Sequence, residues 1–480
     1  MAYRYGDREQ MRLLPQGIED YVPAEHPVRI YDAFVEALDF GSLGIEWDEE
    51  KVGNSEYDPG AMLKLLVYGY SYGVRSSRKL ERETHDNLLF VWLMGGLRPD
   101  HQTIAEFRRR NKGALRGVLR QCAEVCLKLG LIAGNALFVD GTKVRANAGR
   151  AQSHDQGYYE GLLREIDGRI ERLLKECEAA DEREQGDGSW VEIDSELRKA
   201  EGLKRRVEEA LKSFEGTRRR KVNLTDGDCS LMHGVQGDHA SSNVQNVVDG
   251  ENGLIVHTEA VSESLDVNQF SRQIEQANEV LGKPCQVACG DAGYADTKGL
   301  KKLDDQGIKV VVPSVRQARH EEGGPFSKSH FRYEKGQDCY WCPAGQRLKY
   351  AGTVRSTGKR HYQISDGTIC RSCPHYGQCP TSKKGRKIIR LAQEELKAKL
   401  EAQYEGSPEV YAKRKQLVEH PFGHIKRNLQ AGAFLLRGRS GTQAEISLLA
   451  TCFNLVRMMT ILGTETLLKK LAEFRVPESA

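Results

Sequence analysis

Two aspartates follow directly after short apolar stretches of this sequence. Asp140 comes after residues 136–139 (Ala-Leu-Phe-Val), and Asp291 comes after residues 286–290. Because short apolar runs are typical of buried strands, we expect each carboxylate at the C-terminal end of a strand, rigidly held and open to solvent. Oxygen ligands of this kind suit Mg²⁺. The alternative is that each aspartate only begins a turn, since glycine lies nearby in both motifs.

A third acid, Glu419, stands in a segment rich in basic residues. Lys426 follows it by seven residues, about two helical turns, and Lys415 precedes it by four, so a helix would place all three on one face. A carboxylate for a metal beside lysines for phosphate suits metal-dependent phosphoryl transfer. Pro421 is expected to kink or restart this helix, so the shared face depends on a small kink.

Five of the twelve cysteines cluster between residues 339 and 379. Two CxxC pairs separated by 27 residues predict a Cys₄ zinc site, with Cys379 as a substitute ligand. The spacer is longer than is usual for such sites, and free thiols or an iron–sulfur centre are the alternatives. A site with four thiolates has no open position for catalysis. The two predicted pairs are Cys339 with Cys342 and Cys370 with Cys373.

Basic residues come in two bursts within residues 61–130. Tyr68, Tyr70 and Tyr72 are interleaved with the first, which favours a helical module that contacts phosphates over a merely solvated helix face. From these bursts we select the candidate DNA-binding residues Arg75, Arg78, Lys79, Arg108, Arg109 and Arg110, and from the segment around Glu419 we add Lys415, Lys426 and Arg427.

The net charge of +3 over 480 residues conceals a strong segregation of charge. Residues 1–60 hold 5 basic and 14 acidic side chains, whereas residues 61–130 hold 13 and 6, and residues 381–440 hold 14 and 6. The small total therefore does not exclude a nucleic-acid enzyme. No apolar run approaches the length of a membrane span, and the N-terminus shows no export signal, so we expect a cytoplasmic protein with reduced cysteines.

The elements that must position these residues alternate along the chain. Helical periodicity covers residues 61–130, and two amphipathic helices joined at residues 186–189 predict a helical hairpin within residues 151–220. Strands are expected at 136–139, 243–248, 253–261, 286–290 and 309–313, with helices at 267–281 and 298–303. Residues 446–462 predict a core helix. The order predicts an α/β fold with a mixed central sheet flanked by helices.

Four segments of this sequence resemble bacterial insertion-sequence transposases of the DDE type. Three of them are residues 138–148 (Phe-Val-Asp-Gly-Thr-Lys-Val-Arg-Ala-Asn-Ala), 290–296 (Gly-Asp-Ala-Gly-Tyr-Ala-Asp) and 418–428 (Val-Glu-His-Pro-Phe-Gly-His-Ile-Lys-Arg-Asn). Residues 64–81 are similar to the helical domain that precedes the catalytic domain in these enzymes. The resemblance extends over roughly residues 15–465.

The resemblance implies an RNase H-like catalytic domain whose acidic triad, here Asp140, Asp291 and Glu419, binds two Mg²⁺ or Mn²⁺ ions. It implies hydrolysis at the transposon end, followed by attack of the freed 3′-hydroxyl on target DNA. Many relatives carry Tyr-x2-Arg-x3-Glu-x6-Lys around the glutamate. In this chain Glu419 and Lys426 fit, but Lys415 occupies the arginine position, and Tyr411 and Arg414 are displaced by one. Asp226 and Asp228 are secondary acids outside the triad.

We therefore expect a helical DNA-binding domain at 1–130, an RNase H-like domain at 131–440 and a C-terminal helix at 441–480 that packs on the core. Residues 151–220 and 314–400 would be insertions, the second a small cysteine-rich module with a zinc ion. The expected partners are the terminal inverted repeats and target DNA, in a homodimeric synaptic complex near the nucleoid. The alternatives are a catalytically silent DNA-binding protein derived from a transposase, and an RNase H-like nuclease without strand transfer.

Overall fold

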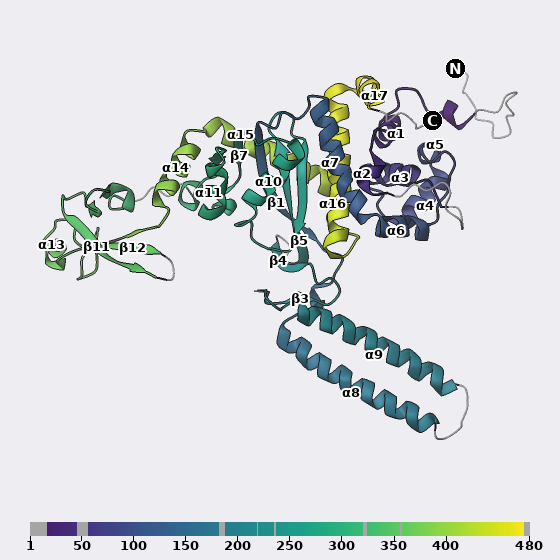
Figure 1. The fold of residues 1–480 in the computed structure, drawn as a ribbon, viewed down its shortest axis with the longest axis horizontal. Helices are drawn as coiled ribbons and strands as arrows, with labels where there is room; N and C mark the ends of the chain where they lie inside the picture. The colour runs from purple at the N-terminus through teal and green to yellow at the C-terminus, as the bar shows by residue number, and fades with distance from the viewer. Residues whose placement is uncertain are drawn as a thin grey trace, which may run out of the picture. The chain divides into compact units, whose positions relative to one another are not determined.

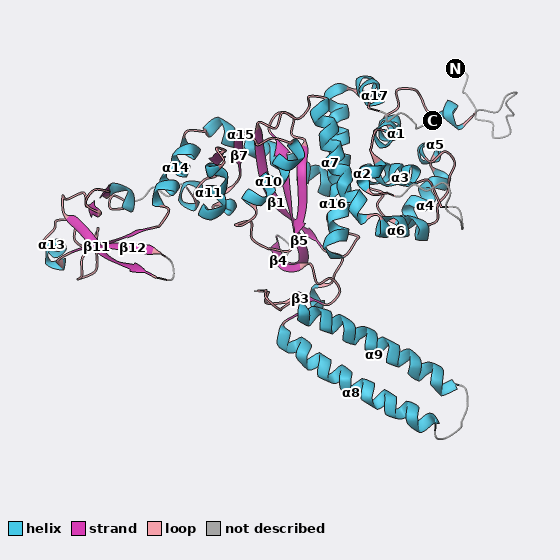
Figure 2. Cartoon of the chain, viewed as in Figure 1, coloured by secondary structure: helices cyan, strands magenta, loops and turns pink. Residues whose placement is uncertain are grey.

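The computed structural model describes residues 17–45, 56–181, 188–217, 219–234, 237–319, 324–355 and 358–474, without the side chains of 178–193. The chain divides into two compact units. Unit 1 comprises Met1–Asp266, Gln273–Cys285 and Lys415–Ala480, and unit 2 comprises Val267–Arg272 and Gln286–Arg414. Figure 1 follows the chain by colour, and Figure 2 separates its helices from its strands.

Unit 1 begins with short helices, as the periodicity of residues 61–130 predicts. Asp58 starts α3 by accepting hydrogen bonds from the N–H groups of Gly60 and Ala61, and Pro59 takes the first helical position. Tyr68 and Tyr70 are buried in this helix, so they belong to the core and not to a phosphate-binding surface. The helices are α1 (Val28–Glu36), α2 (Phe40–Leu43), α3 (Pro59–Ser71), α4 (Ser77–Asp86), α5 (Leu88–Leu93), α6 (His101–Arg110) and α7 (Lys112–Lys128), after a 3₁₀ turn, η1 (Ile18–Tyr21).

Four strands of unit 1 form an antiparallel sheet around β5 (Gly237–Asp249), which pairs with β1 (Ala136–Arg145), β4 (Ser230–Gly234) and β6 (Ile255–Val261). The prediction that Asp140 ends its strand is wrong, because β1 continues five residues further, to Arg145. Asp140 lies in mid-strand opposite Asn246. The apolar run ends at Val139, but backbone pairing with β5 does not require apolar side chains and continues through polar residues.

The long helix α16 (Gly438–Leu462) is the predicted core helix, and it packs against α7, α3 and β6. Its two buried amides bind the backbone of β6. The Asn454 side chain accepts a hydrogen bond from Ile255 N–H and donates one to the Ile255 carbonyl, both at 2.8 Å. The Gln443 side chain accepts from Ala260 N–H at 2.9 Å and donates to the Thr258 carbonyl at 2.8 Å. These amides satisfy a free strand edge, which explains polar residues in so apolar a helix.

Among the described residues, α16 is the one helix long and apolar enough to cross a membrane, but 67% of its most apolar window is buried inside the protein. A buried, amide-bearing helix of this kind is a core helix. The short helix α17 (Thr464–Ala472) follows it.

The helical hairpin consists of α8 (Gln156–Asp181) and α9 (Gly188–Lys212), which lie side by side in Figure 1. Residues 186 and 187 of the predicted turn lie outside the described residues, and α9 begins at Gly188. Tyr159 anchors the base of the hairpin, where its hydroxyl donates to Val222 O at 2.8 Å. The small elements at this base are η2 (Arg150–Gln152), β2 (Ser153–His154) and β3 (Val222–Asn223), and the two strands pair with each other.

Unit 2 contains a parallel pair of strands, β7 (Val287–Cys289) and β8 (Lys309–Val311), connected through the 3₁₀ turn η3 (Ala292–Tyr294) and α11 (Thr297–Asp305). The helices α12 (Val315–Ala318) and α14 (Glu394–Glu405) also belong to it. Two helices, α10 (Phe270–Leu281) and α15 (Pro408–Gly423), begin in unit 2 and end in unit 1.

Strands and helices agree closely with the predicted order, and the mixed α/β class is confirmed. The RNase H-like arrangement stays a prediction.

A second sheet in unit 2 contains the clustered cysteines. Its five antiparallel strands are ordered β13-β12-β11-β10-β9. A small core of Phe331, Tyr340, Leu348, Tyr362 and Ile388 lies against it. The strands are β9 (Arg332–Glu334), β10 (Cys339–Trp341), β11 (Arg347–Val354), β12 (Lys359–Ile364) and β13 (Lys387–Arg390), with η4 (Lys328–His330) before them and α13 (Gly367–Arg371) between β12 and β13. We call residues 324–390 the cysteine module.

Candidate active site

The segment after α15 returns to β1 in unit 1. The Nζ of Lys426 donates to the Thr142 hydroxyl at 2.6 Å and to the Lys143 carbonyl at 3.0 Å. Burial lowers the pKa of Lys426. Because alternate residues of a strand face the same side, Thr142 shares a face with Asp140. The Lys426 ammonium therefore lies on the carboxylate face of β1.

Backbone contacts hold this segment in place. Phe434 N–H donates to Arg145 O at 2.8 Å, and Ala433 forms a parallel bridge with Arg145. Residues almost 300 positions apart in the sequence thus run side by side, so two of the three motifs that resemble DDE transposases meet in one unit.

Glu419 lies on α15 and is exposed. The helix passes through Pro421 without ending there and changes at Gly423 into the π-helical turn η5 (His424–Asn428). A π turn holds more residues than an α turn, so the seven-residue spacing no longer sets Glu419 and Lys426 directly above each other. Their predicted shared face does not follow from spacing alone.

Asp291 follows β7, as predicted, and one of its oxygens accepts a hydrogen bond from Gly293 N–H at 2.8 Å. Its other oxygen, Oδ2, lies 3.4 Å from Nη2 of Arg414. The Arg414 side chain is largely buried. Burial raises the pKa of Cys289 to about 12, and the positive charge of Arg414 acts against this rise. Sequence reasoning set Arg414 aside because it counted back from Glu419. The intact Tyr411-x2-Arg414 spacing was the signal that pointed to it.

Asn246, opposite Asp140 on β5, was also missed. Its side chain is 1% exposed, its oxygen accepts from the Thr258 hydroxyl, and its Nδ2 finds no partner among the described residues. A buried amide donor without a partner is costly and rare in folded proteins. The Nδ2 group of Asn246 is thus a free hydrogen-bond donor on the same sheet face as Asp140.

The donor chemistry of the three acids fits a divalent cation, since Mg²⁺ prefers carboxylate oxygens. Asp140 and Glu419 belong to unit 1 and Asp291 to unit 2. Within the described part of the chain, no three His, Cys, Asp or Glu side chains already form a metal-holding group.

Two of the predicted DNA-binding arginines are buried and have structural roles. Arg75 is 8% exposed, forms a 2.6 Å ion pair with the buried Glu445, and donates to the carbonyls of Gln430 and Ala433. Arg108 is 6% exposed and donates to the Arg75 carbonyl at 2.8 Å. Guanidiniums engaged in this way are not available to phosphate, which corrects their selection. Basic type and spacing cannot distinguish a buried arginine from an exposed one.

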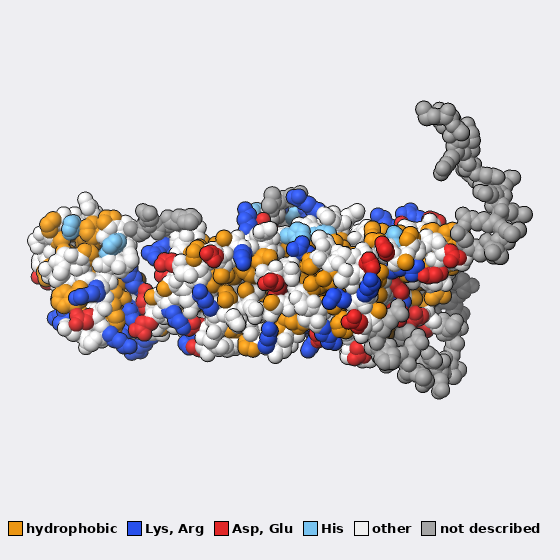
Figure 3. All heavy atoms as spheres, turned by 90° about the horizontal axis from the view of Figure 1, so that it is seen from above, with side chains coloured by type: hydrophobic (Ala, Val, Ile, Leu, Met, Phe, Trp, Pro, Cys, Tyr) orange, Lys and Arg blue, Asp and Glu red, His pale blue; other side chains and the backbone are white. Residues whose placement is uncertain are grey.

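The remaining basic candidates are accessible to different degrees. Arg109 and Arg110 both pair with Glu106 on the surface. In Figure 3, Lys and Arg side chains are interspersed with acidic ones on the face in view, without one large basic patch. Lys426 is half-buried, and the exposed candidates are Arg78, Lys79, Arg109, Arg110, Lys415 and Arg427.

Asp226 and Asp228 cap the N-terminus of α16. The N–H of Gly438 donates to Asp226 at 3.1 Å, and the N–H of Arg439 donates to Asp228 at 2.8 Å. Carboxylates stabilise this positive end of a helix. Both acids thus have a structural role, consistent with their place outside the triad.

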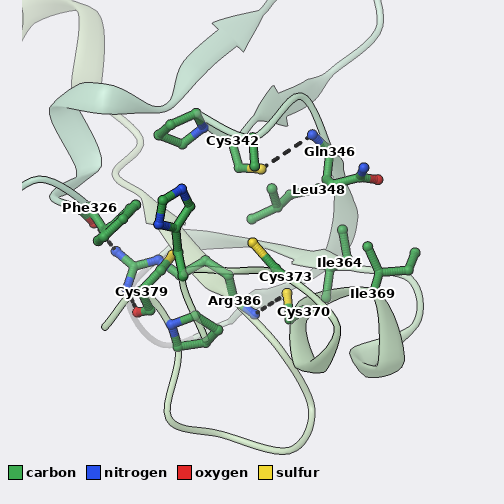
Figure 4. A pocket seen from close by; sticks show the side chains of 14 residues that line it. Phe326, Cys342, Gln346, Leu348, Ile364, Ile369, Cys370, Cys373, Cys379 and Arg386 are labelled. Atoms are coloured by element: carbon green, nitrogen blue, oxygen red, sulfur yellow. Dashed lines mark hydrogen bonds between the residues drawn. The ribbon is translucent and has the colours of Figure 1, made fainter. Parts of the chain in front are cut away.

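All twelve cysteines lie among the described residues, and none of them forms a disulfide. The sulfurs of Cys342, Cys370, Cys373 and Cys379 line one cavity of the cysteine module, as Figure 4 shows. Cys339 does not line it, and lies buried in β10 between β9 and β11. The structure thus does not bring Cys339 together with the other four clustered cysteines, which corrects its selection as a ligand ahead of Cys379.

Comparison with known families matches two parts of the chain. Residues 16–110 match a transposase domain (DUF772), and residues 341–459 match a transposase DDE domain. The second match includes Glu419, Lys426 and the four cavity cysteines. Neither the curated proteins nor the solved structures gave a match.

Proposed function

The matches to a transposase domain and a transposase DDE domain support an insertion-sequence DDE transposase, and from this premise we propose that the protein cleaves DNA at transposon ends and joins them to target DNA. In this proposal residues 131–440 form an RNase H-like catalytic domain, with the cysteine module as an insertion. The protein acts in the cytoplasm on the terminal inverted repeats, as a homodimer.

The contact of Lys426 with Thr142 is the observation that carries the proposal. It joins the segment that holds Glu419 to the strand that holds Asp140, and it sets an ammonium group on the carboxylate face of that strand. Carboxylates for a cation beside an ammonium for phosphate are the components that phosphoryl transfer requires.

In the proposed site, Asp140, Asp291 and Glu419 hold two Mg²⁺ or Mn²⁺ ions. When bound, such ions activate the nucleophile and neutralise charge on the reacting phosphate. Arg414 orients the Asp291 carboxylate, which it approaches to 3.4 Å. Lys426 holds the scissile phosphate, and Lys415 and Arg427 bind neighbouring phosphates. The exposed residues Arg78, Lys79, Arg109 and Arg110 bind the terminal repeats through their phosphates.

The test is a Mg²⁺-dependent cleavage and strand-transfer assay on DNA that carries the flanks of the gene. The wild-type chain is expected to cleave the end and join it to a target plasmid, and Asp140→Asn to bind the same DNA without cleaving it. Equal activity of Asp140→Asn would overturn the triad. Cleavage without joining would favour a nuclease, and binding without cleavage by the wild type would favour a silent DNA-binding protein.

A further inference from the structure

The cysteine module contains a cavity of about 30 Å³, enough room for a single water or ion. Two separate parts of the module supply its thiols. Cys342 comes from the turn between β10 and β11, and the other three come from the segment of α13 and the loop after it (Cys370, Cys373, Cys379).

We propose that Cys342, Cys370, Cys373 and Cys379 bind one structural Zn²⁺ ion, with Cys379 in the place that the CxxC pattern gives to Cys339. Four thiolates in tetrahedral arrangement are the typical donor set of structural zinc. None of the three acids lines this cavity, so zinc binding here does not require the proposed catalytic role of the acids.

The residues that line the cavity decide whether Cys339 or Cys379 is the fourth ligand. Cys339 pairs with both flanking strands in β10, is 0% exposed, and does not line the cavity. Cys379, by contrast, packs beside Cys342 against the small core and faces the cavity. His375 also lines the cavity, but its ring packs on Phe326 at 4.7 Å.

Backbone N–H groups point at two of the sulfurs from opposite sides. Gln346 N–H donates to Cys342 Sγ at 3.2 Å, and Arg386 N–H donates to Cys370 Sγ at 3.5 Å. Hydrogen bonds of this kind orient thiolate ligands and disperse their charge around a metal. They have no comparable value for a neutral thiol in an apolar core, because its sulfur is a weak acceptor.

Two glycines permit this close approach. At Gly385, where φ is +78°, a Cβ would lie 2.4 Å from Ile364 and 3.1 Å from Cys370 Sγ. At Gly367 it would lie 2.3 Å from the Lys383 carbonyl. The backbone of residues 383–386 is therefore pressed onto the turn that carries Cys370, which a free thiol would not require.

The sulfurs line the cavity without yet forming a metal-holding cluster among the described residues. Rotation about χ1 moves a cysteine sulfur from the wall of a cavity toward its centre while the backbone stays in place. The backbone positions thus define the site, and ligand side chains would close on the ion. The module gains from such a bridge because its apolar core is small, centred on a cluster of five buried side chains among the described residues.

The experiment measures the metal content of the full-length protein by elemental mass spectrometry. The protein is purified without chelator from zinc-supplemented cells. The wild type should retain about one zinc per chain, and Cys379→Ser should lose most of it. Cys339→Ala is the matched control and should keep its zinc. Asp140→Asn should keep it too, which separates this site from the proposed catalytic one.

A second variant guards against simple misfolding. Cys379→His offers another zinc ligand at the same position and should restore zinc to the wild-type level. In addition, Co²⁺ bound to the wild type should show the absorption of a tetrahedral thiolate complex, weakened in Cys379→His. The proposal would be overturned if the wild type contained no zinc, or contained iron in its place. It would also be overturned if Cys339→Ala lost as much zinc as Cys379→Ser.

Discussion

The sheet region around β1 and the cysteine module use polar side chains in opposite ways. On β1 and α15, the candidate residues Asp140 and Glu419 are partly or fully exposed on a framework that α16 supports through a large apolar core. In the cysteine module four cysteine side chains line an internal cavity beside a small apolar core.

We therefore expect substitutions in the two regions to affect different properties. Exposed acids on a rigid support can be changed with little effect on folding, whereas inward-facing groups of a small module hold the module together. The following substitutions test this expectation.

The largest effect is expected for Glu419→Gln. Loss of one metal-binding carboxylate should lower Mg²⁺-dependent cleavage by about 1000-fold, equivalent to about 4 kcal/mol of transition-state stabilisation. Because the side chain is exposed, the melting temperature should stay within about 1 °C of the wild type. Cleavage rates and thermal melts measure both. A fall in stability as large as the fall in rate would break the contrast.

Arg75→Ala should have the reverse profile within unit 1. It leaves Glu445 buried without its ion pair, and breaking such a pair costs about 3–5 kcal/mol of stability. Chemical denaturation measures the loss. The matched control is the exposed Arg78→Ala, which should unfold within about 0.5 kcal/mol of the wild type but bind DNA more weakly. Equal stability of Arg75→Ala and Arg78→Ala would contradict the structural role of Arg75.

Gly385→Ala tests the cysteine module without removing a thiol. The left-handed backbone at φ +78° and the contact with Ile364 should cost about 1–3 kcal/mol. Limited proteolysis should then cut first within residues 324–390. The matched control is Gly324→Ala, where a Cβ would meet no atom within 4 Å. Unchanged protease resistance of Gly385→Ala would mean that the close approach does not hold the module.

Lys426→Ala should lower cleavage about tenfold, the effect of losing one charge-assisted hydrogen bond to phosphate. Lys426→Arg retains the charge and should recover part of the rate. Single-turnover kinetics at saturating DNA distinguish this effect from weaker binding. A normal rate for the alanine variant would remove Lys426 from the site.

The smallest effect concerns pH. Burial lowers the pKa of His424, and its Nε2 has no partner among the described residues. The folded state therefore binds fewer protons than the unfolded state, so stability present at neutral pH is lost as pH falls from about 6.5 through the folded pKa. His424→Phe should lose less melting temperature on acidification than the wild type. Parallel pH dependences would exclude this contribution.

Much of the fold was predictable from the sequence because apolar periodicity reports burial. The core helix, the helical hairpin and the strands predicted at 243–248 and 253–261 were found in this way, the last two as β5 and β6. The end of β1 was missed, since hydrogen bonding to β5 carries the strand through Asp140 and on to Arg145. Asn454 in the middle of α16 was visible as an interruption, but its bonds to Ile255 depend on a partner 199 residues away.

The site was less predictable than the fold. Motif order gave the three candidate acids and Lys426, but residue type could not reveal that Arg75 and Arg108 are buried. Spacing favoured Cys339, because CxxC pairs are read as units, whereas strand pairing buries its sulfur. Arg414 illustrates the same limit, since its place beside Asp291 depends on folding and not on its distance from Glu419 in the sequence.

The most direct test of the central claim is cleavage of the protein itself by Fe²⁺ in place of Mg²⁺. With ascorbate and peroxide, iron bound at the acids produces hydroxyl radicals that cut the backbone nearby. We expect cuts near Asp140, Asp291 and Glu419 together, suppressed by excess Mg²⁺ and absent in Asp140→Asn. Cuts at one of these segments alone, or cuts that persist in Asp140→Asn, would contradict a shared metal site.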